Sequence, residues 1–446
     1  MPAGWSLRML LLSAVLLGPA AAQAADLNPV RFVAPNGMTV LVLEQHALPI
    51  VQIHALVRTG SAQDPPEKAG LANLVLSLLD EGTMTRSAEQ IAGEIEFVGG
   101  ALAAKAGEDF TTISVRTLTK DQKLGFGILS DVLMHPVFPE KEFKRVRSQI
   151  LGEILSEKDQ PDLIAVKAFN QLVFDRHPYS WPVNGTERSL LTVSRKDVQA
   201  FYAREYLPNQ TILAVVGDIA VEEARALVAK YFGSWKRGTP PPRPPAAPPA
   251  LEKPVVKLID KDLTQATIVL GHPGISRTNP DFYAVQVMNY ILGAGGFSSR
   301  LMDSIRDNQG LAYGVGSAFD ANLTTGSFFV NLQTRNETAN QAITGVLAEL
   351  KGMVERPATD EELADAKAYL IGSFPLRLDT TQKLADVLSQ VEFYGLGLEY
   401  FTDYPKWIDK VTKEDVLRVA KDYLHPDRYA MVVVGSLAKA KIGRER

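Results

Sequence analysis

Residues 70–83 read GLANLVLSLLDEGT, and this stretch sets the structure around it. Its apolar residues recur at i, i+3, i+4, i+7 and i+8: Leu71, Leu74, Val75, Leu78 and Leu79. That spacing places them on one face of an amphipathic helix. We therefore predict a helix here, with its polar positions, Asn73 and Ser77 among them, one turn apart.

Strands and a second helix surround this helix in the sequence. The strands are indicated by Val40 and Val42, by the apolar run over residues 50–57, and by Ile113 and Val115 alternating with polar neighbours. Ser87 and Gln90 have the spacing of a capping box at the start of the second helix, and the glycines at 99–100 end it. The mixture predicts an α+β fold.

A proline-rich stretch divides the chain. Residues 238–254 read GTPPPRPPAAPPALEKP and contain eight prolines. Proline at this density excludes regular helix and central strand and favours an extended, semi-rigid spacer. A long surface loop within one domain is the alternative interpretation. The linker interpretation gives domains at 25–237 and 255–446, each of ordinary size.

The two halves repeat short features in the same order. Asp197-Val198, residues 206–208 and residues 214–217 of the first half correspond to Asp415-Val416, residues 423–426 and residues 432–435 of the second. Glu142 and Gly152 are separated as Glu362 and Gly372 are, by ten positions. The common order predicts a duplicated domain.

The composition and the N-terminal sequence limit the classes of function that are open to this protein. The 446 residues carry a net charge of −4 and no cysteine, which excludes disulfides, thiolate catalysis and iron–sulfur clusters and gives no basic field for nucleic acid. Residues 1–24 have a positive start, a short apolar run and a small-residue cleavage site, as a secretory signal peptide does. We expect a secreted, periplasmic protein with no membrane span after signal cleavage; an uncleaved anchor is the alternative.

The sequence resembles the pitrilysin/insulinase family of zinc peptidases. The resemblance is carried by Gly60-Ser61, residues 70–77 and 80–83, residues 87–100, 138–153 and 184–186, and residues 298–313, and it covers the mature chain. It implies two homologous domains, each a mostly antiparallel sheet packed by helices, forming a clamshell. The family places an inverted H-x-x-E-H motif at 73–77 to bind zinc and supply a general base.

The catalytic residues of that motif are replaced in this chain. Asn73 and Ser77 stand at the histidine positions and Leu76 at the glutamate position. The family's distant glutamate ligand corresponds to Glu153. One carboxylate with weak neutral donors does not hold zinc, and leucine cannot accept a proton. The resemblance therefore predicts no metal or other cofactor in this chain.

The second half retains family features near residue 300. Gly295 and Gly296 belong to a glycine-rich loop that the resemblance places against bound peptide; a flexible turn before a helix is the alternative. Arg306 and Tyr313 have the spacing of the family's Arg–Tyr pair, which completes the active site formed by the zinc-bearing domain. A surface ion pair and a core tyrosine are the alternative. Ala103-Ala104 replaces the family's Asn-Ala pair on the edge strand that binds substrate.

These features lead to a function hypothesis. The chain resembles the non-catalytic subunit of a two-chain peptidase, supplying Arg306 and Tyr313 to a homologous partner that carries zinc and the intact H-x-x-E-H motif, with a peptide substrate between them. A stand-alone peptide-binding or scaffolding protein is the second hypothesis, and an active enzyme with unorthodox ligands is a third. A homodimer is an alternative assembly.

Overall fold

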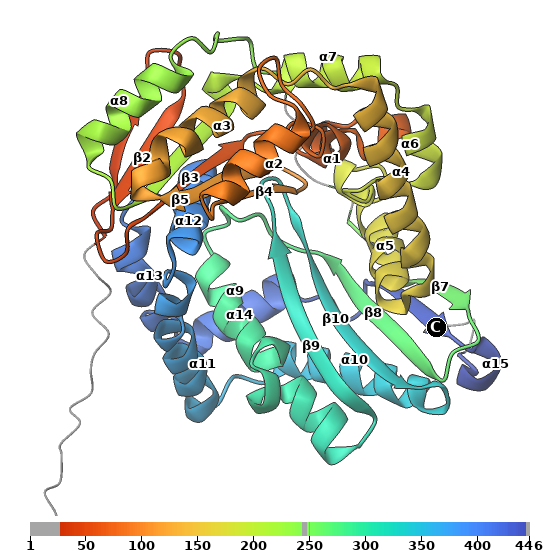
Figure 1. Ribbon diagram of the computed structural model, residues 1–446. Helices are drawn as coiled ribbons and strands as arrows, with labels where there is room; N and C mark the ends of the chain where they lie inside the picture. Colours follow the sequence, from red (N-terminus) through yellow and green to blue (C-terminus); the bar gives the residue numbers. More distant parts are fainter. Residues whose placement is uncertain (1–26, 243–247, 249, 443–446) are drawn as a thin grey trace, which may run out of the picture.

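The computed structural model describes residues 27–242, 248 and 250–442. The predicted signal peptide, 1–24, and part of the predicted linker, 243–247 and 249, lie outside this range. The described parts of the linker form neither helix nor strand. On either side of it the chain builds a sheet with helices packed against it, and the two sheets make the upper and lower halves of Figure 1. The α+β prediction is confirmed.

The first sheet is mixed but mostly antiparallel. Its strands run in the order β1 (Val30–Val33), β2 (Thr39–Glu44), β6 (Thr211–Gly217), β3 (Ile50–Val57), β5 (Thr111–Leu118) and β4 (Ala101–Ala106). Only the β2–β6 pair is parallel. The three strands predicted from apolar patterns correspond to β2, β3 and β5, and all three are confirmed.

The second sheet repeats the first. Its order is β7 (Val255–Asp260), β11 (Ala430–Gly435), β8 (Gln265–Pro273), β10 (Gly326–Arg335) and β9 (Ala312–Ala321), with β7–β11 as its parallel pair. The strand order and directions match those of the first sheet from β2 to β4. The predicted duplication is confirmed, because the repeated segments at 214–217 and 432–435 lie in the equivalent strands β6 and β11.

Helices cover both sheets. The first half contributes α1 (Leu71–Leu76), α2 (Ala88–Phe97), α3 (Gln122–Met134), α4 (Glu140–Ser156), α5 (Pro161–Phe174), α6 (Glu187–Thr192), α7 (Arg195–Glu205) and α8 (Val221–Phe232). The second contributes α9 (Phe282–Asn289), α10 (Ala339–Glu355), α11 (Asp360–Gly372), α12 (Thr381–Tyr394), α13 (Tyr400–Asp409), α14 (Lys413–Tyr423) and α15 (Leu437–Ala440). The equivalent helices α7 and α14 both begin with a capping box, Ser194 with Asp197 and Thr412 with Asp415. No described helix is long and apolar enough to cross a membrane.

The halves exchange one helix each. α5 of the first half packs on β8 and β11 of the second sheet, where Phe169 and Phe329 meet edge to face with ring centroids 6.2 Å apart. α12 of the second half packs on β3 and β6 of the first sheet, and an ion pair of 2.9 Å joins Arg31 to Glu392 beside it. Both helices lie between the sheets in Figure 1. The buried apolar surface at these contacts binds the halves together.

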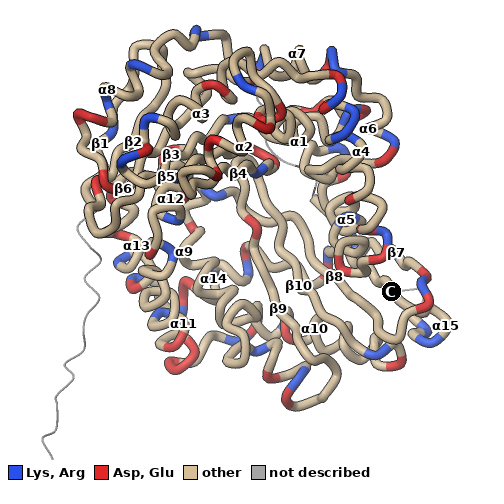
Figure 2. The backbone as a smooth tube through the Cα atoms, in the orientation of Figure 1, with Lys and Arg blue, Asp and Glu red and all other residues tan. Residues whose placement is uncertain are grey.

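Charged side chains are spread over both halves. Figure 2 shows Lys and Arg interspersed with Asp and Glu along the chain, on helices and on loops alike. Many exposed pairs are local, such as Lys144 with Glu140 and Lys383 with Asp379, each one helical turn apart. Pairs of this kind contribute little to stability, roughly 0.3–0.5 kcal/mol each.

Candidate functional site

The motif helix α1 is fixed by its N-terminal end. Gly70 adopts φ +95° there, and a Cβ atom on it would lie 2.8 Å from the carbonyl oxygen of Asn184. The buried Asp64 carboxylate accepts hydrogen bonds of 2.8 Å from the backbone N–H groups of Gly70 and Ala72. Burial raises the pKa of Asp64 to about 8, although these N–H groups favour its charged form. Local packing therefore positions α1 without any ligand.

The side chains at the motif positions do not form a metal site. Leu76 is 3% exposed and belongs to the core of the first half. Ser77 lies at the C-terminal end of α1, and its hydroxyl donates to the backbone carbonyl of Asn73 at 2.9 Å. That hydrogen bond occupies the hydroxyl proton within the helix itself. The arrangement offers one half-buried amide, one occupied hydroxyl and no base.

Glu153 does not complete a ligand set. It is exposed on α4 and accepts a hydrogen bond of 3.2 Å from Gln149, one turn earlier. Across the described part of the chain, no group of three or more His, Asp or Glu side chains is placed to hold a metal ion. Zinc, which the family binds with two imidazoles and a carboxylate, does not fit the donors present here.

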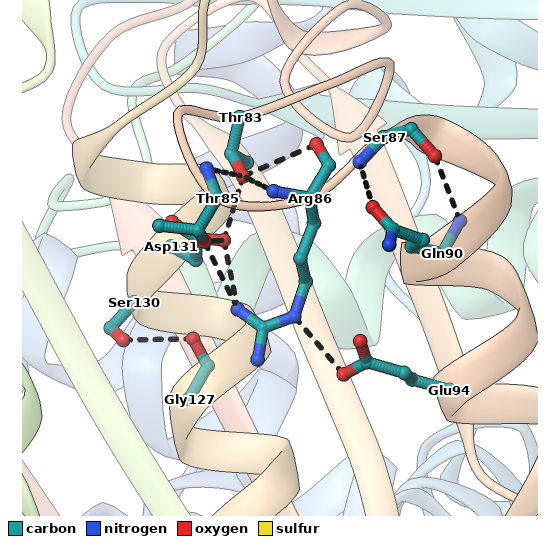
Figure 3. A network of polar contacts seen from close by, with 9 residues as sticks. All are labelled: Thr83, Thr85, Arg86, Ser87, Gln90, Glu94, Gly127, Ser130 and Asp131. Carbon is teal, nitrogen blue, oxygen red and sulfur yellow. Dashed lines mark hydrogen bonds and ion pairs between the residues drawn. The ribbon is translucent and has the colours of Figure 1, made fainter.

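The loop that follows α1 is held by a polar network, which Figure 3 shows. The buried Asp131 carboxylate of α3 accepts hydrogen bonds from the hydroxyls of Thr83 and Thr85, both at 2.7 Å, and from the Arg86 guanidinium at 2.9 Å. Burial opposes ionisation of Asp131, but these three donors outweigh it and hold its pKa below the ordinary value. The predicted capping box of α2 is confirmed beside this network. The network is structural, since Asp131 accepts from both threonine hydroxyls and Arg86 is held between Asp131 and Glu94.

The glycine-rich loop of the second half combines tight and open positions. A Cβ atom on Gly295 would lie 2.7 Å from the carbonyl oxygen of Tyr290, so this position tolerates only glycine. Gly296 adopts φ +60°, and a Cβ atom there would meet nothing within 4 Å. The loop thus turns sharply while its outer side stays open. Phe297, the next residue, is 73% exposed.

The structure brings Arg306 and Tyr313 together. Arg306 lies in a π-helical segment, Met302–Asn308, and Gly310 at φ +60° turns the chain into β9. Tyr313 is 90% exposed, and the Arg306 guanidinium lies 5.8 Å from its ring centroid and 4.9 Å from that of Phe297. The helix–turn–strand geometry predicted from the spacing is therefore present. Arg306 also forms a 2.9 Å ion pair with Asp307.

These two groups of residues are not joined within the chain. No hydrogen bond, ion pair or ring contact in the described structure connects Arg306 or Tyr313 with Asn73, Ser77 or Glu153. Tyr313 is exposed and Arg306 half-buried on the second half, whereas the apolar residues of the motif helix belong to the core of the first. The second half thus presents hydrogen-bond donors at Arg306 and Tyr313, whereas Asn73, Leu76 and Ser77 carry no side chain that could act as a general base.

Comparisons with known proteins agree with this architecture. The sequence profile of the insulinase family (peptidase family M16) matches residues 39–187, and that of the peptidase M16 inactive domain matches residues 192–370. An uncharacterized zinc protease of Mycobacterium leprae is 31% identical over 420 residues, covering 92% of both chains. The chain belongs to the insulinase family. An uncharacterized zinc protease of Streptomyces coelicolor is 29% identical, over 93% of this chain and 91% of that one.

Two solved structures show the same fold. A crystal structure described as a peptidase M16 inactive domain from Pseudomonas fluorescens aligns with a TM-score of 0.87 and 28% identity, over 92% of this chain and 98% of that one. A protease from Helicobacter pylori aligns with a TM-score of 0.86 at 21% identity, over 92% of this chain and 99% of that chain, a likeness of fold. The predicted family and the two-domain clamshell fold are thus confirmed.

Two further details of the site concern the edge strand β4 and Phe297. Ala103 and Ala104 are exposed on β4, which is an edge strand of the first sheet, so an added strand could pair there through its backbone. No role for Phe297 was predicted from the sequence. Its contact with Arg306 makes it part of the candidate site.

Proposed function

We propose that this insulinase-family chain is the non-catalytic subunit of a secreted, periplasmic zinc peptidase. A homologous subunit carries zinc and the intact H-x-x-E-H motif, and this chain supplies Arg306 and Tyr313. The observation that carries the proposal is the cluster of Phe297, Arg306 and Tyr313 in a chain whose own motif positions carry no imidazole or carboxylate. The N-terminal sequence supports secretion.

The chemistry of the pair suits a peptide substrate. The Arg306 guanidinium offers several fixed donors, and the Tyr313 hydroxyl offers one. Both can donate to a peptide carbonyl or to the negative charge that develops on it during hydrolysis, and a hydrogen bond to a charged group contributes roughly 1.5–3 kcal/mol. The guanidinium lies 4.9 and 5.8 Å from the rings of Phe297 and Tyr313 and donates through Nη1 to Asp307 at 2.9 Å. These contacts restrict its rotation and leave its other N–H groups for a ligand.

The test is reconstitution with a homologue that has an intact motif. The mature chain alone should neither bind stoichiometric zinc, by elemental analysis after dialysis, nor hydrolyse an unfolded peptide above background. The pair should hydrolyse it, and Arg306→Ala or Tyr313→Phe in this chain should each lower kcat by ~10²–10³, the usual effect of removing a donor to a developing oxyanion. Co-purification and melting temperature should not change.

Matched controls come from the same half. Arg356→Ala removes an exposed arginine and Tyr369→Phe removes the hydroxyl of an exposed tyrosine, both outside the candidate site, and both should leave activity unchanged. If the Arg306 and Tyr313 variants retain full activity, the proposal is wrong. Peptide binding without any partner, combined with no activity in any pair, would favour the stand-alone peptide-binding protein instead.

A further inference from the structure

A cavity of about 580 Å³ lies on the face of the second sheet that looks toward α5. Tyr313 stands at its rim, and its lining includes Asp162 of α5 and three side-chain amides, those of Gln265, Asn331 and Gln333. Its volume is within the range of ligand-binding sites in proteins. α5 packs chiefly over β8 and β11 and also reaches β10, where Phe169 meets Phe329 and Asp162 accepts from Gln333. Asn331 of β10 and Tyr313 of β9 stay exposed.

Two of the side-chain amides in this cavity are spaced like the peptide groups of an extended chain. Asn331 and Gln333 are two apart on β10 and therefore point to the same face, with an expected separation of about 6.6–6.8 Å. The N–H and C=O groups on one side of an extended peptide recur at the same interval. Each side-chain amide carries one acceptor oxygen and two donor hydrogens, the same groups that a peptide bond presents.

The hydrogen-bonding capacity of these amides is not used up within the chain. Gln333 donates to the Asp162 carboxylate at 2.9 Å, and no further hydrogen bond of its side chain is present among the described residues. The Asn331 side chain makes no hydrogen bond to any residue that the structure describes. Both side chains are exposed. A ligand can therefore accept from Asn331 and donate to the carbonyl oxygens of both amides.

Two glycines keep the floor of the cavity open. Gly316 pairs with Asn331 across β9 and β10, and Gly314 lies at the register irregularity beside Gln333. A Cβ atom on Gly314 would meet nothing within 4 Å, and one on Gly316 would make only ordinary contacts, the nearest at 3.5 Å. Neither adopts positive φ. Neither packing nor backbone conformation requires glycine here, and glycine weakens a strand, which fits close approach of a ligand backbone.

We propose that this cavity binds an extended segment of the substrate peptide through its main chain, with Asn331 and Gln333 pairing to alternate peptide groups over the bare surface of β9. The identification of the bound peptide as the substrate rests on the proposed function. In this mode the protein recognises the backbone of the peptide rather than its side chains, so peptides of many different sequences can bind. The occupied segment ends at Tyr313, next to Arg306.

The experiment measures binding by the mature chain without any partner. The probe is a fluorescein-labelled nine-residue peptide of Ser, Thr and Val, followed by fluorescence anisotropy. Asn331→Leu and Gln333→Met should each raise Kd by roughly 2- to 10-fold, the effect of one neutral hydrogen bond. Gly314→Val should abolish binding by filling the floor without lowering the melting temperature. Gln382→Met, an exposed glutamine of α12, and Gly152→Ala, an exposed glycine of α4, are the controls.

The main-chain mode has its own test. Two versions of the peptide carry N-methyl groups at alternate residues, one in odd and one in even positions. One version should bind as the parent does and the other should lose binding, because only one set of N–H groups faces the amides. Equal binding of both versions, no binding by the wild-type chain, or unchanged binding by Gly314→Val would each overturn the inference. Such results would leave the Arg306 and Tyr313 effects in the reconstituted pair standing, so the two proposals fail separately.

Discussion

Substitution of Phe297 tests whether the Arg306 guanidinium has to be held in place. The ring of Phe297 lies 4.9 Å from the guanidinium, closer than that of Tyr313 at 5.8 Å. Both distances are within the ~6 Å range of a cation–π contact, which contributes about 0.5–1 kcal/mol at an exposed site. Loss of the Phe297 contact should therefore lower kcat of the reconstituted pair by about 2- to 5-fold for Phe297→Ala.

The effect should be confined to catalysis. Phe297 is 73% exposed, so its removal should change the free energy of unfolding by less than about 0.5 kcal/mol. Phe297→Trp should retain or raise kcat, because indole is the best cation–π partner, whereas Phe297→Leu should resemble Phe297→Ala. Rescue by an aromatic ring separates positioning of Arg306 from a general apolar contact.

The assay is steady-state hydrolysis of a quenched fluorescent peptide by the pair, with kcat and KM resolved. We expect kcat to fall while KM changes little, because the contact orients a donor that acts on developing charge. A fall in melting temperature with Phe297→Ala would point to a packing role instead. Equal kcat for the wild type, Phe297→Ala and Phe297→Trp would refute the reasoning.

Three further predictions concern the fold. Burial lowers the pKa of His272 to about 3, so the folded chain holds this side chain neutral and is fully stabilised by it above pH ~6.5. By pH 4.5 the free energy of unfolding should fall by about 2–3 kcal/mol, measured by urea unfolding. The fall should be smaller in His272→Gln. Asp131→Ala removes the shared acceptor of two threonine hydroxyls and one of the two carboxylates that pair with Arg86, the other being Glu94. It should destabilise the chain by about 1–3 kcal/mol by the same method, whereas an unchanged free energy of unfolding would contradict the network. Leu76→Glu places a carboxylate at a core position and should lower stability by several kcal/mol; an unchanged melting temperature would show that the position can open.

The sequence predicted well those helices and strands in which one hydrophobic period dominates. β2, β3 and β5 and the capping box of α2 were expected from local pattern alone, and the repeat was expected from the order of short matches. The motif helix was expected to continue through Leu79, but α1 ends at Leu76. The backbone N–H groups of Leu78 and Leu79 bond to the carbonyls three residues earlier, at 3.1 and 3.2 Å, which tightens the last turn. Side-chain period does not distinguish such a turn from α-helix.

The exchanged helices and the peptide-sized cavity could not be predicted from the sequence. α5 and α12 have apolar faces like any surface helix, and nothing local indicates that each covers the sheet of the other half. The cavity over β9 is lined on one side by Asp162 and Val166 of α5, and it stays open because Gly314 and Gly316 carry no side chain. Both features depend on contacts between distant segments.

The contrast between the well-packed helix α1 and the exposed rings beside Arg306 supports the proposed partner subunit. α1 needs no metal, because Asp64, the close approach of Gly70 to Asn184, and the core position of Leu76 already fix it, so the missing ligands leave the fold intact. In the second half, by contrast, the residues of the candidate site are not fixed by burial within the chain. Two aromatic rings there stay exposed beside a guanidinium, where they bury little apolar surface and contribute little to folding. Exposed rings of this kind stabilise a complex when another molecule docks on them and removes them from water, as the proposed partner subunit or its peptide would do.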